Sequence, residues 1–240
     1  MKRTFLFSLY ETPQGKLLQT LEASYLKRSI MVSCKQTILQ IGALGWENEF
    51  IDCSLYQKYS ILDAKGEGCK ESVKIFGKSY QLPVQSETVD LVILPHLLEF
   101  DAHRFQTMRE IERVLKPEAE VIIINFNSLS IWVRLQFLWN KKMSRSWKGH
   151  FINRTRVADW LKLLNFEILT TSEFTLDSIL TTPEKFKLGK RTYFSMAYAV
   201  RAVKRRYTLI PLAPAKAEPS RLVVVSTGIE PSAQRLKKDD

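Results

Sequence analysis

Residues 82–132 read LPVQSETVDLVILPHLLEFDAHRFQTMREIERVLKPEAEVIIINFNSLSIW, and this stretch decides the fold. Residues 89–94 and 121–126 are apolar runs without polar alternation, which is typical of strands covered on both faces of a sheet. Between them, residues 102–115 carry apolar side chains at helical spacing, and Lys116-Pro117 then ends the helix. The stretch therefore predicts a strand, a helix and a second, parallel strand.

Similar patterns lie on both sides of this stretch. We expect further strands at 36–41, 59–62, 73–76, 166–170 and 192–203, and helices at 14–29 and 156–164, the latter capped by Thr155. Strands that alternate with helices indicate an α/β fold, in which a mostly parallel sheet has helices on both faces.

A glycine-bearing turn follows the first of these strands, in the sequence ILQIGALGW at 38–46. Ligands of open α/β sheets bind at the carboxyl ends of the strands, and Gly42 and Gly45 let the backbone approach a ligand closely. No Gly-Lys-Ser or Gly-Lys-Thr follows, so the turn is not a P-loop. Two glycines are also common in ordinary turns, so this feature alone does not define a site.

The order of these parts resembles a class I S-adenosylmethionine-dependent methyltransferase. It is most similar to the type 11 methyltransferase domain, and within it to a poorly characterised subgroup of bacterial proteins. The residues that carry the resemblance are Leu82-Pro83, Ser86 to Leu91, Leu94-Pro95-His96, Leu98-Glu99-Phe100, Arg109-Glu110, Arg113-Val114-Leu115, Phe126-Asn127, Ser130, Asp159 to Leu161 and Leu164 to Glu167. The opening, with its helix after Gly15 and with Glu22, is similar to the same subgroup. The likeness covers roughly residues 10–210, and the block 82–127 is its most specific part.

The resemblance implies a Rossmann-like, doubly wound sheet of seven strands, mostly parallel with the last strand antiparallel. It also implies S-adenosyl-L-methionine as the cofactor. Gly42, Ala43 and Gly45 would face the methionine part of the cofactor, and Asp63 the ribose hydroxyls. The remaining expected cofactor contacts are Lys78 and Ser79 near the adenine, and Pro95 and His96 beside the sulfonium.

The chain departs from the family at three of these places. Gln40 stands where the first strand usually carries an acid, and Trp46 stands where a third glycine often lies. Lys78 replaces the acid that accepts a hydrogen bond from the adenine amino group, and a lysine cannot accept one. In addition, Glu118-Ala119 replaces the usual glycine after the lysine-proline turn. These substitutions favour a fold that has lost activity as an alternative.

Candidate catalytic and substrate residues lie at the ends of the central strands. His96 is a candidate general base, because histidine exchanges protons near neutral pH; the alternative is a strand-end residue bonded to the backbone or the cofactor. Glu99 either reaches the acceptor or stabilises the start of the next helix. Asn127 either bonds the acceptor or caps the next segment.

The net charge of +11 and the pI near 9.6 favour anionic partners. Basic residues and aromatic residues such as Trp132 concentrate in residues 128–155, which we interpret as a lid over the acceptor pocket, an insertion or a helical hairpin with a buried aromatic face. The same composition suits an acidic membrane surface, with nucleic acid as a weaker alternative.

Three parts are expected: an N-terminal helical lead-in at 1–35, a methyltransferase-like domain at 36–211, and a loosely ordered basic tail at 212–240. The N-terminus has no secretory signal pattern and the three cysteines show no zinc spacing, so we predict a cytoplasmic protein without a metal site, peripheral to a membrane if it binds one.

Three functions remain open from the sequence. The first is an S-adenosylmethionine-dependent methyltransferase acting on a small or lipid-like acceptor. The second is a non-catalytic binding or partner protein on a methyltransferase fold. The third is an RNA methyltransferase, which the charge permits although no RNA-binding motif is present.

Overall fold

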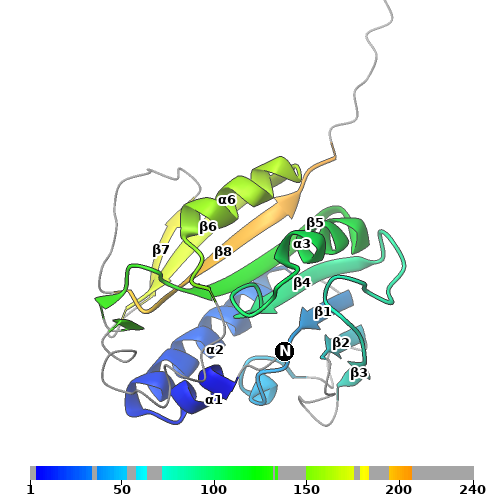
Figure 1. Ribbon diagram of the computed structural model, residues 1–240. Helices are drawn as coiled ribbons and strands as arrows, with labels where there is room; N and C mark the ends of the chain where they lie inside the picture. Colours follow the sequence, from blue (N-terminus) through cyan, green and yellow to red (C-terminus); the bar gives the residue numbers. More distant parts are fainter. Residues whose placement is uncertain are drawn as a thin grey trace, which may run out of the picture. The chain divides into compact units, whose positions relative to one another are not determined.

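The computed structural model describes residues 4–33, 37–52, 58–63, 72–131, 133–134, 150–175, 179–183 and 195–206. Contacts between residues divide the chain into two units, Met1–Arg206 and Tyr207–Asp240, and the second lies outside the described residues. The described residues form one eight-stranded sheet with the strand order β3-β2-β1-β4-β5-β8-β6-β7 (Figure 1). Its strands are β1 (Thr37–Ile41), β2 (Lys58–Leu62), β3 (Val73–Ile75), β4 (Val89–Pro95), β5 (Leu115–Phe126), β6 (Phe166–Phe174), β7 (Ile179–Pro183) and β8 (Ala197–Lys204).

The predicted fold class is confirmed. Strands β1 to β5 run parallel, and β8, the last strand, runs antiparallel to both its neighbours, β5 and β6. The sheet has one strand more than the seven expected, because β7 adds antiparallel to β6 at the edge.

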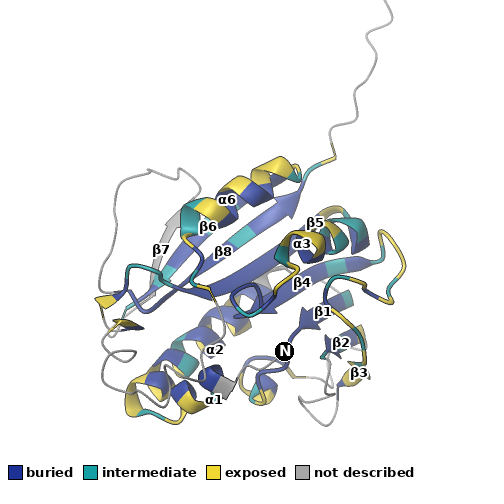
Figure 2. Ribbon diagram, in the orientation of Figure 1, coloured by how far each residue is buried: buried dark blue, intermediate teal, exposed yellow. Residues whose placement is uncertain are grey.

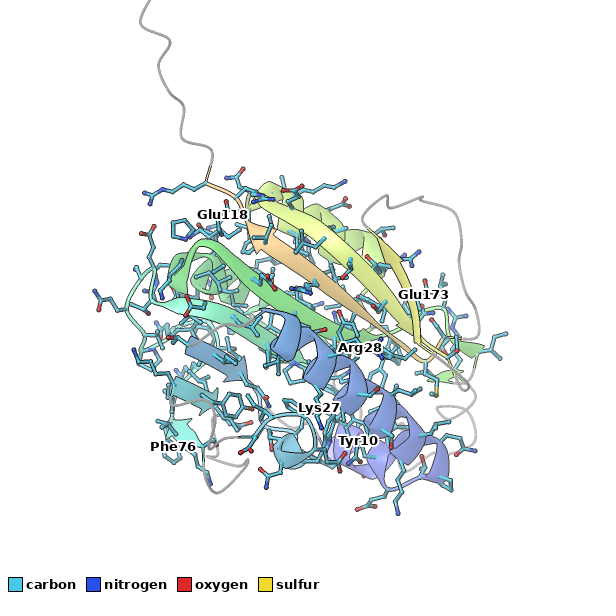
Figure 3. The ribbon with its side chains drawn as sticks, turned by 180° about the vertical axis from the view of Figure 1, so that it is seen from behind. Tyr10, Lys27, Arg28, Phe76, Glu118 and Glu173 are labelled. Atoms are coloured by element: carbon cyan, nitrogen blue, oxygen red, sulfur yellow. The ribbon has the colours of Figure 1, made fainter. Side chains whose placement is uncertain are left out.

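Helices cover both faces of the sheet. Alternating residues of the central strands supply two cores: Ile93 and Ile124 face α1 (Thr4–Tyr10) and α2 (Pro13–Ser33), whereas Val92 and Ile123 face α3 (Arg104–Val114) and α6 (Arg154–Leu163). The central strands β4, β5 and β8 are buried along most of their length (Figure 2). Helix α2 crosses the face of the sheet opposite α3 and α6. Figure 3, which views the molecule from behind, shows α2 in front of the sheet. Helix α1 was not expected from the sequence, yet its own residues Phe5 and Leu6 are fully buried in the core on this face of the sheet.

The connection from β1 to β2 has no α-helix in its described part, residues 42–52. Parallel strands are normally joined by a crossover of a dozen or more residues that contains an α-helix. Here the described part of the connection holds a single 3-10 turn, η1 (Glu47–Glu49), and residues 53–57 are not described. Helices α1 and α2 pack on this face of the sheet instead, against Ile38, Tyr59 and Ile61 of β1 and β2.

Four described residues other than glycine take left-handed backbone conformations, and two of them, Glu118 and Asn165, flank helices α3 and α6. Glu118 has φ 60° in the position where the family usually has glycine, so the backbone shape is kept at a cost of about 1 kcal/mol. Asn165 has φ 60° just after α6, where asparagine often ends a helix. Helix α6 itself begins with Asn153, whose side chain accepts from Thr155 N, so Asn153 and not Thr155 is its N-cap.

Arg113 ties helix α3 to the turn that precedes β4. Its guanidinium donates to the carbonyls of Leu82 at 3.1 Å and Val84 at 3.0 Å, and Glu110 accepts from both Arg113 and Leu82 N. Residues 82–127 therefore encode a clamp, in which the side chains of Glu110 and Arg113 provide hydrogen-bond partners for the backbone groups of Leu82 and Val84.

Replacing Arg113 with lysine is expected to lower the unfolding free energy by about 1–2 kcal/mol, because lysine keeps the charge and loses the planar fork. Urea denaturation measures the change. Arg109→Lys on the same helix is the control, since Arg109 is exposed. Equal stability of the two variants would contradict the clamp.

Candidate functional site

The carboxyl ends of β1, β2 and β4 lie side by side and bring most of the predicted site residues together. In the parallel register Gln40 pairs with both Ile61 and Ile93, so the residues after these strands meet at one edge. Gly42 N donates to Leu62 O at 2.8 Å, and Asp63 Oδ2 accepts from Ala43 N at 3.0 Å. The glycine turn and Asp63 are thus joined directly, with Pro95 and His96 on the neighbouring strand end.

The two glycines of the turn are required by the backbone. Gly42 has φ 99° and Gly45 has φ 89°, a region that residues with a Cβ rarely adopt. Gly42 is buried, whereas Gly45 is exposed. A Cβ built on Gly45 would meet no heavy atom within 4 Å, so that side of the turn is open.

Glu47 organises this turn, a role that the sequence did not reveal. Its side chain is 1% exposed, and its carboxylate accepts from Leu44 N at 2.6 Å and Gly45 N at 3.1 Å. Gln40 Nε2 donates to the same carboxylate at 3.1 Å and to Gly42 O at 2.9 Å, while Gln40 Oε1 accepts from Tyr59 at 2.6 Å. The acid that is missing from β1 at Gln40 therefore has a counterpart seven residues later.

His96 lies in a fully buried network that joins α2 to β4 and β5. Its Nε2 is 2.9 Å from Glu22 Oε1, and its Nδ1 is 3.2 Å from Glu99 Oε2. Glu99 Oε1 accepts from Phe126 N at 2.7 Å, and the His96 ring lies 4.1 Å from the ring of Phe126. The backbone of His96 is left-handed, with φ 48°.

The charge state of His96 follows from its two carboxylate neighbours. Burial alone lowers the pKa of His96, but the charges and hydrogen bonds of Glu22 and Glu99 outweigh it and raise that pKa to about 9. Burial also raises the pKa of Glu99. His96 is therefore an imidazolium at neutral pH, with both nitrogens engaged.

These contacts bear on two sequence interpretations. Both ring nitrogens of His96 face a carboxylate oxygen, which agrees with the alternative of a strand-end residue held by hydrogen bonds, whereas a general base needs a nitrogen that is free to take a proton. Glu99 is 1% exposed and both its oxygens are bonded inside the protein, so it does not reach toward an acceptor.

Tyr10 connects this network to the glycine turn. Its hydroxyl donates to Glu22 Oε2 at 2.6 Å, and its ring lies edge-on to Trp46 at 5.6 Å. Figure 3 labels Tyr10 on α1, beside α2. The two N-terminal helices thus reach the ends of both β1 and β4. Glu22 and Tyr10 were missed as site residues because their partners lie far away in the sequence.

The remaining predicted residues are placed as follows. Ser79 is buried and donates to Asp101 Oδ2 at 2.9 Å, and the exposed Lys78 lies 5.5 Å from the centre of the Tyr80 ring. Asn127 accepts from Leu129 N and donates to Ser195, which matches the capping alternative. Trp132 and most of the basic segment lie outside the described residues.

Comparisons with known proteins agree with the fold. The family model of the type 11 methyltransferase domain matches residues 52–123. An S-adenosylmethionine-dependent methyltransferase of Thermotoga maritima, a possible histamine N-methyltransferase, has a TM-score of 0.57 at 14% identity, over 83% of this chain and 100% of its own. A second one, from Archaeoglobus fulgidus, has a TM-score of 0.55 at 16% identity, over 76% of this chain and 94% of its own.

A curated relative is the uncharacterized protein YafS of Escherichia coli strain K12. It is 27% identical over 137 residues, which is 57% of this chain and 55% of the relative, so the match spans about half of its length.

The fold is that of the class I S-adenosylmethionine-dependent methyltransferases, and the family model extends the likeness to the sequence of the central strands. The resemblance to the type 11 methyltransferase domain is thereby confirmed. The matched family model implies S-adenosyl-L-methionine as the cofactor.

The described residues fit this cofactor at two of its three parts. Asp63 stands at the end of β2 beside the turn, where a carboxylate suits the ribose hydroxyls. At the amino-acid end, the turn offers a buried carboxylate, and the buried Trp46 Nε1 has no hydrogen-bond partner among the described residues. At the adenine, Lys78 offers a donor where the amino group needs an acceptor.

Membrane spans and metal clusters are both absent from the described residues. The helices there are too short or too polar to cross a lipid bilayer. The same residues contain no group of three or more histidine, cysteine or acidic side chains that could hold a metal ion.

Proposed function

We propose that this protein is an S-adenosylmethionine-dependent methyltransferase that acts on a small or lipid-like acceptor. The observation that carries the proposal is the junction of Asp63 with the glycine turn through Ala43 N, at the edge where the fold binds its cofactor. The basic and aromatic composition of residues 128–155 supports the acceptor class.

The chain's own residues would mainly bind and orient. S-adenosyl-L-methionine supplies a methyl group already activated on a sulfonium, so the site has to place an acceptor atom in line rather than provide covalent help. Asp63 would hold the ribose, and the turn from Gly42 to Gly45 would hold the amino-acid end. His96 is held between Glu22 and Glu99, so in this arrangement it would position the strand end rather than take a proton from the acceptor.

Asp63→Asn is expected to weaken binding of S-adenosyl-L-methionine by about 10- to 100-fold, because a charged acceptor is worth about 1.5–3 kcal/mol. Isothermal calorimetry measures the change. Asp159→Asn on α6 is the control, since Asp159 is exposed on the other face of the sheet. Unchanged affinity in Asp63→Asn would remove Asp63 from the site.

The acceptor class has a separate test. Phospholipid that copurifies with the protein, or flotation with acidic vesicles at physiological salt, supports a lipid-like acceptor. Full turnover of a water-soluble amine or thiol without vesicles would contradict the lipid-like class and favour the small one.

A non-catalytic methyltransferase-fold protein is the second candidate. It is favoured by the β1–β2 connection, whose described part holds a 3-10 turn and no α-helix, and by Gln40 and Lys78. No heat of binding with either S-adenosyl-L-methionine or S-adenosylhomocysteine would favour it over the enzyme.

A further inference from the structure

Glu47 is a buried carboxylate that the described residues leave without a cation. Its side chain is 1% exposed, and its contacts are N–H donors: Leu44 N, Gly45 N and the amide of Gln40. None of the ion pairs among the described residues includes it. Buried charges in proteins are usually paired or bind a ligand of opposite charge, so this one calls for an explanation.

The carboxylate also has acceptor capacity left. Two carboxylate oxygens offer about four acceptor sites, and three donors are in place here. The neighbouring Gly45 is exposed, and the space around its missing Cβ is open to 4 Å. A positively charged group that enters beside Gly45 would therefore lie in the field of a carboxylate that water reaches poorly, where attraction is strong.

A hydrogen-bond donor accompanies the carboxylate. Trp46 follows Gly45 directly, and its buried Nε1–H has no acceptor among the described residues. Both groups belong to the same turn, and a ligand group that carries an ammonium and a carboxylate, as the amino-acid end of the cofactor does, would need an acceptor and a donor of these kinds.

We propose that Glu47 binds the positively charged amino-acid end of the cofactor and supplies the charge that β1 lacks at Gln40. This inference rests on the proposed function. The alternative is that Glu47 only shapes the turn by accepting from Leu44 N and Gly45 N. The two roles differ in what they predict for ligands of different charge.

The test compares three ligands on Glu47→Gln by calorimetry: S-adenosyl-L-methionine, S-adenosylhomocysteine and 5′-methylthioadenosine. Glutamine keeps the shape of the side chain and removes its charge. Binding of the first two should weaken by about 10- to 100-fold, because they carry an ammonium. Binding of the third should change less than about 3-fold, because it has no charged group to lose a partner.

Glu49→Gln is the matched control, since Glu49 lies in the same 3-10 turn and is exposed. It should bind all three ligands as the unchanged protein does. Equal weakening of the three ligands in Glu47→Gln, or no weakening at all, would overturn the proposal. If the unchanged protein bound none of them, the proposed function itself would fail, which is a different result.

A measurement on the unchanged protein guards against a variant that does not fold. S-adenosylhomocysteine should bind at least about 10-fold more tightly than its analogue without the amino group. Equal affinity for these two ligands would contradict a cation site at Glu47.

Discussion

Replacing Glu22 with leucine is expected to lower the unfolding free energy at pH 7 by about 3–5 kcal/mol, because removal of one partner leaves a buried charge uncompensated. Glu22 is 1% exposed and accepts from both Tyr10 and His96. The variant therefore leaves the imidazolium of His96 and the hydroxyl of Tyr10 without this acceptor. Urea denaturation measures the loss. Glu11→Leu is the control, since Glu11 is exposed in the turn between α1 and α2.

The same variant should change how stability depends on pH. The pKa of His96 is about 9 in the folded protein, whereas the ordinary pKa of a histidine in an unfolded chain is 6.5, so the folded state binds more protons between these limits. The contribution of protonated His96 to the unfolding free energy is fully present below pH 6.5. It is lost as the pH rises through 9, and the loss amounts to roughly 3 kcal/mol. In Glu22→Leu this alkaline loss should shrink, because the Glu22 charge is the main cause that raises the pKa. Parallel curves for the two proteins would contradict the network.

The central part of the fold could be predicted from the sequence because its signals are local and repeated. The apolar runs at 89–94 and 121–126 fall on β4 and β5, and the helix expected at 102–115 falls on α3, Arg104–Val114. Continuous apolar strands need cover on both faces, which leaves few topologies for them. The edge strand β7 and helix α1 were missed, since α1 has only 7 residues and its burial depends on the sheet beneath it.

The chemistry of the site was harder to predict, because it depends on single polar residues and distant partners. Glu22 and His96 are 74 positions apart, and nothing in the sequence of α2 marks its one acidic residue as the partner of a strand end. Histidine between two buried carboxylates becomes a cation, whereas the same residue in an open crevice would suit a base. The position of His96 was therefore predictable, and its protonation state was not.

Gln40 and Glu47 show a related limit. A sequence pattern with an acid in β1 indicates that the acid is lost at Gln40, because the pattern compares one position at a time. The structure places Glu47 against Gln40 Nε2 at 3.1 Å, so the two side chains form one unit. Only the path of the turn brings them together, and that path depends on two left-handed glycines.

Gly42→Val is expected to weaken binding of S-adenosyl-L-methionine by more than about 100-fold while the protein stays folded. Gly42 has φ 99°, and a β-branched residue there strains the backbone by about 1–3 kcal/mol, less than the 5–15 kcal/mol of a typical domain. A turn that relaxes this strain moves Ala43 N away from Asp63 Oδ2 and the donors at Leu44 and Gly45 away from Glu47. Calorimetry measures the affinity, and the melting temperature confirms that the variant is folded.

Gly45→Ala separates strain from steric blocking. Gly45 is also left-handed, with φ 89°, but a Cβ there meets no atom within 4 Å and the position is exposed. The alanine should therefore lower the unfolding free energy by about 1 kcal/mol and weaken cofactor binding much less than Gly42→Val does. If a folded Gly42→Val protein bound the cofactor as tightly as the unchanged chain, the turn would not be the cofactor loop, and the strand ends of β1 and β2 would have to serve another purpose.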